Sequence, residues 1–163
     1  MLVAKKIKLD VSDQDAATLE WMQGKCRGLY NWWIMKLRDG EERWPGWQVA
    51  KKTLQASKAH DPELCFVYGK CLAEVYFRLG AAMDAFFRRV KNGEKPGFPR
   101  VRPRHCFFTL IYPAMYIQVE GLSLRLPTGG RGKNKRFPDV VARLTEEAPT
   151  NYKDVAISRD GQG

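Results

Sequence analysis

The chain has 163 residues, of which 44% are hydrophobic and 12% aromatic. This composition excludes wholesale disorder, because a disordered chain has too little apolar surface to offset the entropy lost on folding. The formal net charge is +10, which favours a nucleic acid or an anionic membrane as partner. A membrane is the weaker choice, since the sequence has no run of about 18 apolar residues and begins without the features of a signal peptide.

The positive charge is concentrated in one part of the sequence. Between Arg88 and Arg136 there are twelve Lys and Arg against two Asp and Glu, and eight of the twelve are Arg. This segment opens with residues 86–104, which we call the basic strap and which three prolines interrupt. Because guanidinium groups make planar contacts with phosphates and bases, the segment predicts a nucleic-acid-binding surface.

The first part of the chain predicts a strand and then a long helix. Residues 3–9 alternate apolar and basic side chains, as in a half-exposed strand. Ser12 can cap a helix that continues to about Arg38. Gly24 and Gly28 would each weaken this helix by about 1 kcal/mol relative to Ala, so we expect another backbone to approach them closely. The predicted buried stripe is Leu19, Met22, Cys26, Tyr30, Trp33 and Leu37.

Two further helices are predicted. Residues 47–58 form a short amphipathic helix with Val49, Ala50 and Leu54 facing inward. The Asp-Pro-Glu of residues 61–63 predicts the start of a long helix, because Asp is a good N-cap and Pro suits the first helical position. We expect that helix to end at residues 92–93 (Asn-Gly), and the three helices to form a small antiparallel bundle.

The sequence after the basic strap predicts strands. Residues 106–112 are rich in aromatic and β-branched side chains, and residues 116–126 alternate as in a β-hairpin that turns at Glu120-Gly121. Residues 129–136, which we call the cationic loop, contain three glycines and four cations, and we expect this loop to be flexible.

The last predicted strands are residues 140–144 and 155–158. Asp160-Gly161 is a turn without a strand after it, so residues 155–158 would form an unpaired edge. We therefore expect the sequence to be a piece of something longer, or a partner to complete the sheet.

Patterns that indicate catalysis or metal binding are weak. His105 and Cys106 are neighbours on a predicted strand, where adjacent side chains point to opposite faces, so they do not form a catalytic dyad. The four cysteines (Cys26, Cys65, Cys71 and Cys106) lack the spacing of metal ligands. We interpret them as reduced, buried thiols of a cytoplasmic protein. No glycine-rich phosphate loop precedes a helix, so we expect no cofactor.

Three sequence motifs occur in order along nearly the whole chain. In the first, residues 24–33 contain Cys-Arg-Gly-Leu-Tyr-Asn. In the second, residues 82–88 end in Phe-Phe-Arg and are followed by Gly-Phe-Pro-Arg-Val-Arg at residues 97–102. In the third, residues 117–127 end in Leu-Arg-Leu-Pro. Together they resemble the signatures of TnpB proteins, the transposon-associated RNA-guided nucleases. Type V CRISPR effectors descend from that family and share its architecture.

The resemblance implies an α+β fold. Residues 1–11 and 96–163 would supply the strands of a wedge domain, a small OB-like β-barrel, and residues 12–95 would form an inserted three-helix recognition domain. In the family these domains bind guide RNA, its heteroduplex with target DNA, and a short DNA motif that flanks the target. By position, the resemblance implies that Trp47, Lys51, Tyr68 and Lys70 contact the flanking motif.

Charge and resemblance together define the candidate nucleic-acid-binding residues. These are Arg27, Trp47, Lys51, Tyr68, Lys70, Arg88, Arg89, Lys91, Lys95, Arg100, Arg102, Arg104, Arg131, Lys133, Lys135 and Arg136.

The expected function is a binding module without catalytic activity of its own. The family cuts DNA with a RuvC domain and a zinc ribbon, both of which would follow Gly163, so guide RNA and target DNA are the expected partners. One alternative is a split nuclease completed by a separate RuvC-bearing chain. Another is a guide-independent, helix-turn-helix DNA-binding protein such as a transposon-associated repressor. In each case we expect a bacterial or archaeal cytoplasmic protein, nucleoid-associated when bound.

Overall fold

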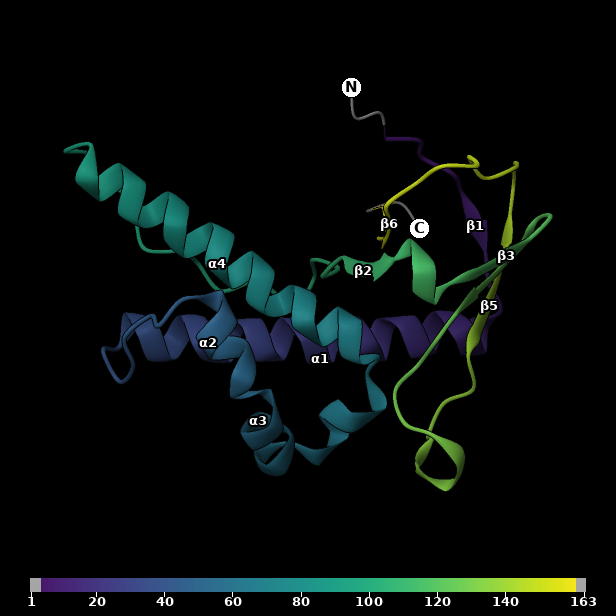
Figure 1. Cartoon of the computed structure of the whole chain (residues 1–163), viewed down its shortest axis with the longest axis horizontal. Helices are drawn as coiled ribbons and strands as arrows, with labels where there is room; N and C mark the ends of the chain where they lie inside the picture. The colour runs from purple at the N-terminus through teal and green to yellow at the C-terminus, as the bar shows by residue number, and fades with distance from the viewer. Residues whose placement is uncertain (1–3, 161–163) are drawn as a thin grey trace.

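The computed structural model describes residues 4–160 and shows an α+β fold (Figure 1). The α-helices are α1 (Asp13–Arg38), α2 (Trp47–Lys52), α3 (Leu54–His60) and α4 (Gly69–Lys91). The strands are β1 (Leu9–Asp10), β2 (Leu110–Pro113), β3 (Gln118–Glu120), β4 (Ser123–Leu126), β5 (Val140–Leu144) and β6 (Asp154–Ile157). The 3₁₀-helices are η1 (Pro62–Phe66), η2 (Ala114–Tyr116) and η3 (Gly132–Asn134).

The first predicted helix is confirmed as α1, together with its cap. The Ser12 hydroxyl oxygen accepts a hydrogen bond from the Asp15 N–H at 3.1 Å. The helix ends at Asp39, and Gly40 then adopts a φ of +76°. All residues of the predicted stripe are buried, because residues three and four apart share one helix face.

The expected close approach to Gly24 and Gly28 is wrong. An added Cβ at Gly28 would meet nothing within 4 Å, and one at Gly24 would meet only the end of the Arg27 side chain, at 3.7 Å. The tight contact lies in α4 instead, where a Cβ on Gly80 would be 3.0 Å from the Cβ of Trp47. Gly80 therefore lets α2 approach α4.

The helix predicted at residues 47–58 is divided into α2 and α3 at Thr53. The Thr53 hydroxyl donates to the Ala50 carbonyl at 2.6 Å, and such side-chain bonds compete with the helical pattern. Ala50 is buried as predicted, whereas Val49 is 51% exposed. Val49 was wrongly placed inside because the Ala50 side of α2 is the one that faces α4.

Residues 61–63, which predict the start of the long helix, instead begin the 3₁₀-helix η1. The Asp61 carboxylate accepts a hydrogen bond from the Glu63 N–H at 3.3 Å. Val67 then takes an extended conformation and buries its side chain, so the chain changes direction before α4 begins at Gly69. The predicted end of α4 is confirmed, since Gly93 follows the cap with a φ of +80°.

The two long helices run in the same direction, so the predicted antiparallel bundle is wrong (Figure 1). Cys26 of α1 lies near Cys71 at the start of α4. Further along both helices, the ring centroids of Trp33 and Tyr76 are 6.2 Å apart. The segment from α2 to η1 carries the chain back before α4 begins. Periodicity identifies the buried face of a helix but not its direction.

In the part of the chain that the structure describes, the strands form two antiparallel sheets that do not close into a barrel. One sheet has the order β1-β5-β4-β3, and the other pairs β2 with β6. The predicted hairpin is confirmed as β3 and β4, with Glu120 opposite Ser123 and Gly121 at a φ of +57°.

Two strand predictions need correction. The first strand is shorter than residues 3–9, because only Leu9 and Asp10 pair with β5; Val3 lies outside the described residues. The last strand is not an unpaired edge, since β6 pairs with β2 from Asp154 to Ile157. The predicted turn that follows includes Gly161, also outside the described residues. β6 therefore has a partner along one of its two edges.

One hydrophobic core joins the helices to the sheets. Its buried side chains include Met22 and Ile34 of α1, Leu72 of α4, and Leu126 and Val140 of the larger sheet. The domain boundaries that the sequence suggests, after residues 11 and 95, stay predictions.

The prediction of four buried thiols is half right. Cys26 and Cys71 are buried free cysteines, but Cys65 and Cys106 are exposed. The sequence placed Cys65 on a long amphipathic helix and Cys106 on a strand, whereas the first lies on the 3₁₀-helix η1 and the second on an irregular segment.

Native alkylation should therefore modify two of the four thiols. Burial raises the pKa of Cys71 to about 12 and that of Cys26 well above its ordinary value, so both lack thiolate as well as access. Iodoacetamide at neutral pH should add to Cys65 and Cys106 first, and to the other two only in guanidinium chloride. Mass spectrometry of the adducts checks this, and equal labelling of all four in the native protein would contradict the fold.

Candidate nucleic-acid interface

The basic strap runs back between α4 and α1 (Figure 1), where its backbone is bound by Asn31 of α1. The Asn31 amide Nδ2 donates to the Arg102 carbonyl at 2.9 Å, and Asn31 Oδ1 accepts from the Arg102 N–H at 2.7 Å. A side-chain amide that pairs with both backbone groups of a residue acts like a neighbouring strand. Asn31 thus fixes the strap without using the Arg102 guanidinium.

Arg27 extends this contact along α1. Its Nη1 donates to the Arg104 carbonyl at 3.2 Å and to the Cys106 carbonyl at 3.4 Å. The same nitrogen donates to Gln23 Oε1 at 3.2 Å. The sequence analysis predicted that Arg27 contacts nucleic acid; the structure places its guanidinium against the strap backbone.

Gln23 completes a row of polar side chains that the sequence analysis missed. Its Oε1 also accepts from the Phe108 N–H at 2.8 Å, and Gln23 is 1% exposed. Gln23, Arg27 and Asn31 are four residues apart and therefore share one face of α1. We call them the polar row. The sequence feature that could have indicated this row is the position of Gln23 next to Met22 of the buried stripe. An amide buried there requires hydrogen-bond partners.

Helix α4 holds the residues that follow the strap from the other side. An Arg78 Nη2 donates to the Thr109 carbonyl, and the Arg78 Cζ lies 4.4 Å from the Phe108 ring centroid. Burial lowers the pKa of the Arg78 guanidinium. The ring centroids of Phe86 and Phe98 are 5.1 Å apart. Both ends of the strap are therefore anchored by groups other than its exposed arginines.

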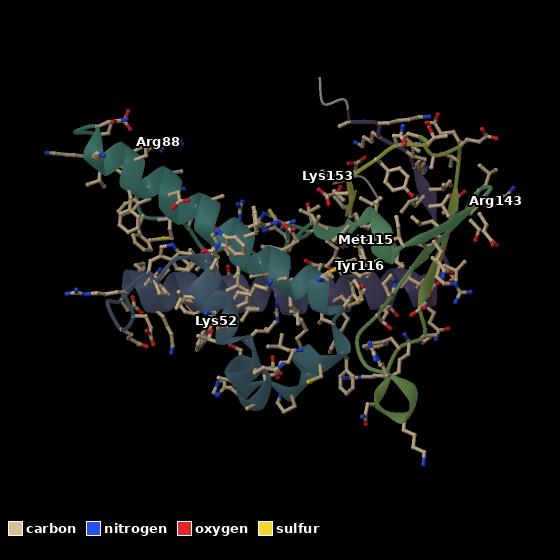
Figure 2. The ribbon with its side chains drawn as sticks, viewed as in Figure 1. Lys52, Arg88, Met115, Tyr116, Arg143 and Lys153 are labelled. Carbon is tan, nitrogen blue, oxygen red and sulfur yellow. The ribbon has the colours of Figure 1, made fainter. Side chains whose placement is uncertain are left out.

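Because the backbone is what the protein binds, the strap cations remain available to solvent. Arg100, Arg102 and Arg104 are exposed, and Arg89 lies 3.9 Å from Glu94. Figure 2 shows Arg88 at the far end of α4. In the described part of the chain, no ion pair is seen for these exposed cations: Arg88, Lys91, Lys95, Arg100, Arg102 and Arg104.

Removing the polar row should loosen the strap without touching its charge. Asn31→Ala deletes two hydrogen bonds and should lower the free energy of unfolding by roughly 1–3 kcal/mol. Trypsin should then cut after Arg100 or Arg104 faster than in the wild type, which mass spectrometry of the fragments measures. Gln14→Ala, an exposed change on the same helix, serves as the control; equal cleavage of all three proteins would contradict the proposed anchoring.

The four residues chosen for a flanking DNA motif lie in two places. The Trp47 ring packs at a tilt against the Phe77 ring, with centroids 4.7 Å apart, and Lys51 is exposed on the same short helix, α2. Tyr68 and Lys70 lie at the start of α4 instead. Trp47 packs against Gly80, which lies about 16 Å along α4 from its first residue at a rise of 1.5 Å per residue. The four residues therefore do not form one site.

Beside the start of α4 lie two exposed residues that were not predicted as site residues, Met115 and Tyr116. Tyr68 stacks on Tyr112 with centroids 5.6 Å apart, and Lys70 Nζ lies 5.0 Å from the ring of Tyr116. Met115 is 80% exposed beside them (Figure 2). Burial raises the pKa of Tyr68, so its hydroxyl stays protonated.

The cationic loop packs against η1. The Gly129 N–H donates to the Phe66 carbonyl at 3.0 Å, and a Cβ on Gly129 would overlap the carbonyl oxygens of Cys65 and Val67. Only glycine fits there. The loop that the sequence predicted to be flexible is therefore bound at its start.

Two cations of the loop region are neutralised by acids. Arg136 Nη1 lies 2.9 Å from Glu63 Oε2, and Lys135 pairs with Asp139. Hydrogen bonds from Lys25 and then Arg136 lower the pKa of Glu63. Burial by itself lowers the pKa of Lys25, but Glu63 and a second acid, Asp61, outweigh this and leave it raised. Lys135 and Arg136, which the sequence analysis placed in nucleic-acid contact, thus already have intramolecular partners.

The basic strap and the cationic loop lie on opposite faces of α1. Arg27 contacts the strap and Gln23 contacts Phe108 just after it. Trp21 and Lys25 face the loop side, with the Arg136 Cζ 5.2 Å from the Trp21 ring. Residues two apart in a helix point about 200° away from each other. In Figure 1 the strap runs above α1 and the loop lies below it. The charged segment that is continuous in sequence is therefore two surfaces in space.

Comparison with known proteins identifies no family for the chain. No protein-family model matches it, and a search of curated proteins finds no relative. Within residues 4–160, none of the helices is both long and apolar enough to cross a membrane. The same residues contain no cluster of three or more His, Cys, Asp or Glu side chains placed to hold a metal ion.

Proposed function

We propose that this chain is a nucleic-acid-binding module of an RNA-guided DNA-targeting protein. The observation that carries the proposal is the way the basic strap is held. Gln23, Arg27 and Asn31 bind backbone groups of residues 102–108, and the arginine side chains remain exposed. Arginine side chains carried on a fixed backbone can follow a phosphate backbone without first losing loop entropy.

The RNA-guided part of the proposal rests on the motifs that resemble TnpB proteins. It is supported by contacts between residues of these motifs. Asn31 of the first motif binds Arg102 of the second, and within the second motif Phe86 packs on Phe98. These residues together hold the strap in place, which gives the shared spacing a physical reason.

In this proposal the helices form the recognition domain and the strands belong to a wedge domain. The two sheets would be parts of its OB-like barrel. Guide RNA and its heteroduplex with target DNA would lie along the strap, and Trp47, Lys51, Tyr68 and Lys70 would read the flanking motif from two places. The chain by itself would bind and not cut.

A salt titration tests the binding part. Fluorescence anisotropy with a hairpin RNA and with a duplex DNA should show log Kd rising linearly with log salt, with a slope of about 0.7 per single-strand phosphate contact or 0.9 per duplex contact. Affinity that stays flat between about 50 and 200 mM salt would contradict nucleic-acid binding.

A capture experiment tests the guided part. The protein is loaded with a hairpin RNA that carries an extension of about 20 nucleotides, and a DNA containing the complementary sequence is then added. Retention of that DNA above a scrambled DNA supports RNA guidance. A preference for one duplex sequence without any RNA would instead favour a guide-independent DNA-binding protein.

A further inference from the structure

A hollow lies between η1 and the cationic loop, on the face of α1 opposite the strap. Its volume is about 570 Å³, within the range of small-ligand sites. Cys65 and Phe66 of η1 form one wall, and the loop supplies the rest. Its loop residues are Gly130, Arg131, Lys133, Asn134, Lys135 and Arg136.

The wall formed by the loop is anchored at both ends. At the start, the Gly129 N–H bonds to the Phe66 carbonyl at 3.0 Å. The Thr128 side chain is 4% exposed, and its hydroxyl donates to the Phe137 carbonyl at 2.7 Å, which joins the two ends of the loop. The backbone that carries the cations is therefore held at both ends before any ligand arrives, which reduces the entropy cost of binding.

The charge around the hollow is only partly compensated. Glu63 holds Arg136 and Asp139 holds Lys135. Arg131 and Lys133 are exposed, and within residues 4–160 no acid pairs with either of them. About two positive charges thus remain at the hollow, which matches the charge of one phosphate group.

We propose that this hollow is a phosphate-binding site, separate from the strap, with Arg131 and Lys133 as its principal ligands. A guanidinium and an ammonium group on an anchored loop suit the tetrahedral oxygens of phosphate. The aromatic ring of Phe66 beside them offers a surface for the base or sugar attached to that phosphate. The site takes a phosphate group of a nucleic acid, at an end or within the strand, or of a free nucleotide. Only its assignment to a bound nucleic acid rests on the proposed function.

Thiol protection tests the site directly, because exposed Cys65 lies in its wall. Cys106→Ser leaves Cys65 as the exposed thiol, and its labelling rate is measured with inorganic phosphate or chloride at equal ionic strength. Phosphate should slow labelling saturably, several-fold, in this protein and in an added Arg143→Ala/Lys153→Ala control. It should have no effect when Arg131 and Lys133 are changed to Ala. Absence of protection in the first protein, or equal protection in all three, would overturn the site.

The source of the phosphate is found with oligoribonucleotides. Anisotropy compares a 5′-phosphorylated and a 5′-hydroxyl strand on the wild type and on Arg131→Ala/Lys133→Ala. Weaker binding of the phosphorylated strand alone indicates a terminal phosphate, and weaker binding of both indicates a phosphate within the strand. If phosphate protects Cys65 but the loop variant binds both strands normally, the site serves a free nucleotide. A further outcome separates the two proposals. If strap variants lose RNA binding, loop variants keep it and phosphate does not protect Cys65, the phosphate site is refuted and the proposed function stands.

Discussion

Trp33→Ala should lower the free energy of unfolding by roughly 3–5 kcal/mol, because truncation of a buried aromatic leaves a cavity. Trp33 is 4% exposed, and its ring contacts those of Trp44 and Tyr76 with centroids 6.0 and 6.2 Å away. This cluster joins α1 to α4 and to the turn that precedes α2. The loss should be visible as a lower midpoint in guanidinium chloride unfolding.

Phe87→Ala is the matched control, since it removes an aromatic ring that is 49% exposed. We expect its unfolding free energy to change by less than about 1 kcal/mol. Its effect should fall on binding, because an exposed ring beside Arg88 can stack on a base, an interaction of roughly 1–3 kcal/mol. If Phe87→Ala destabilised the protein as much as Trp33→Ala, the burial pattern of α4 would be wrong.

The sequence predicted the elements whose signals are local. The Ser12 cap, the stripe of α1, the Asn92-Gly93 end of α4 and the hairpin at Gly121 all depend on residues within a few positions of one another. Side-chain spacing and turn chemistry determine such features directly. Their agreement with the structure follows from that.

The features that sequence analysis missed depend on contacts between distant residues. Val67 interrupts a helical pattern because its side chain is needed in the core, which moves the start of α4 past the cap at Asp61. The pairing of β2 with β6 joins Tyr112 to Val155, with 42 residues between them. Neither the shifted start of α4 nor the pairing of β2 with β6 can be predicted from the local sequence pattern. The parallel direction of α1 and α4 cannot be predicted from it either.

The same division applies to the candidate site. Composition identified the charged segment, and the exposure of Arg100, Arg102 and Arg104 agrees with a role in binding. Composition does not distinguish a cation free for a ligand from one already bound within the protein. Arg27 is already bound within the protein because it donates to a strap carbonyl, and Arg136 because it pairs with Glu63.

Replacing Arg100, Arg102 and Arg104 of the strap together should then have the largest effect on binding. Arg100→Ala/Arg102→Ala/Arg104→Ala removes three exposed charges while leaving the backbone bonds to Asn31 and Arg27 in place. If each arginine contacts one phosphate of a duplex, the slope of log Kd against log salt should fall by about 2.7. A slope lowered by this amount should weaken binding by more than tenfold at low salt.

The control for this variant must lose the same charge elsewhere. Arg43→Ala/Arg143→Ala/Lys153→Ala removes three exposed cations, and Figure 2 shows Arg143 and Lys153 on the side of the molecule away from Arg88. Both triple variants reduce the net charge from +10 to +7, so a general electrostatic effect would weaken both equally. A selective loss in the strap variant, with unchanged unfolding free energy, would locate the contacts on the strap. Equal losses would mean that the protein binds by net charge alone, and that the polar row anchors the strap for a purely structural reason.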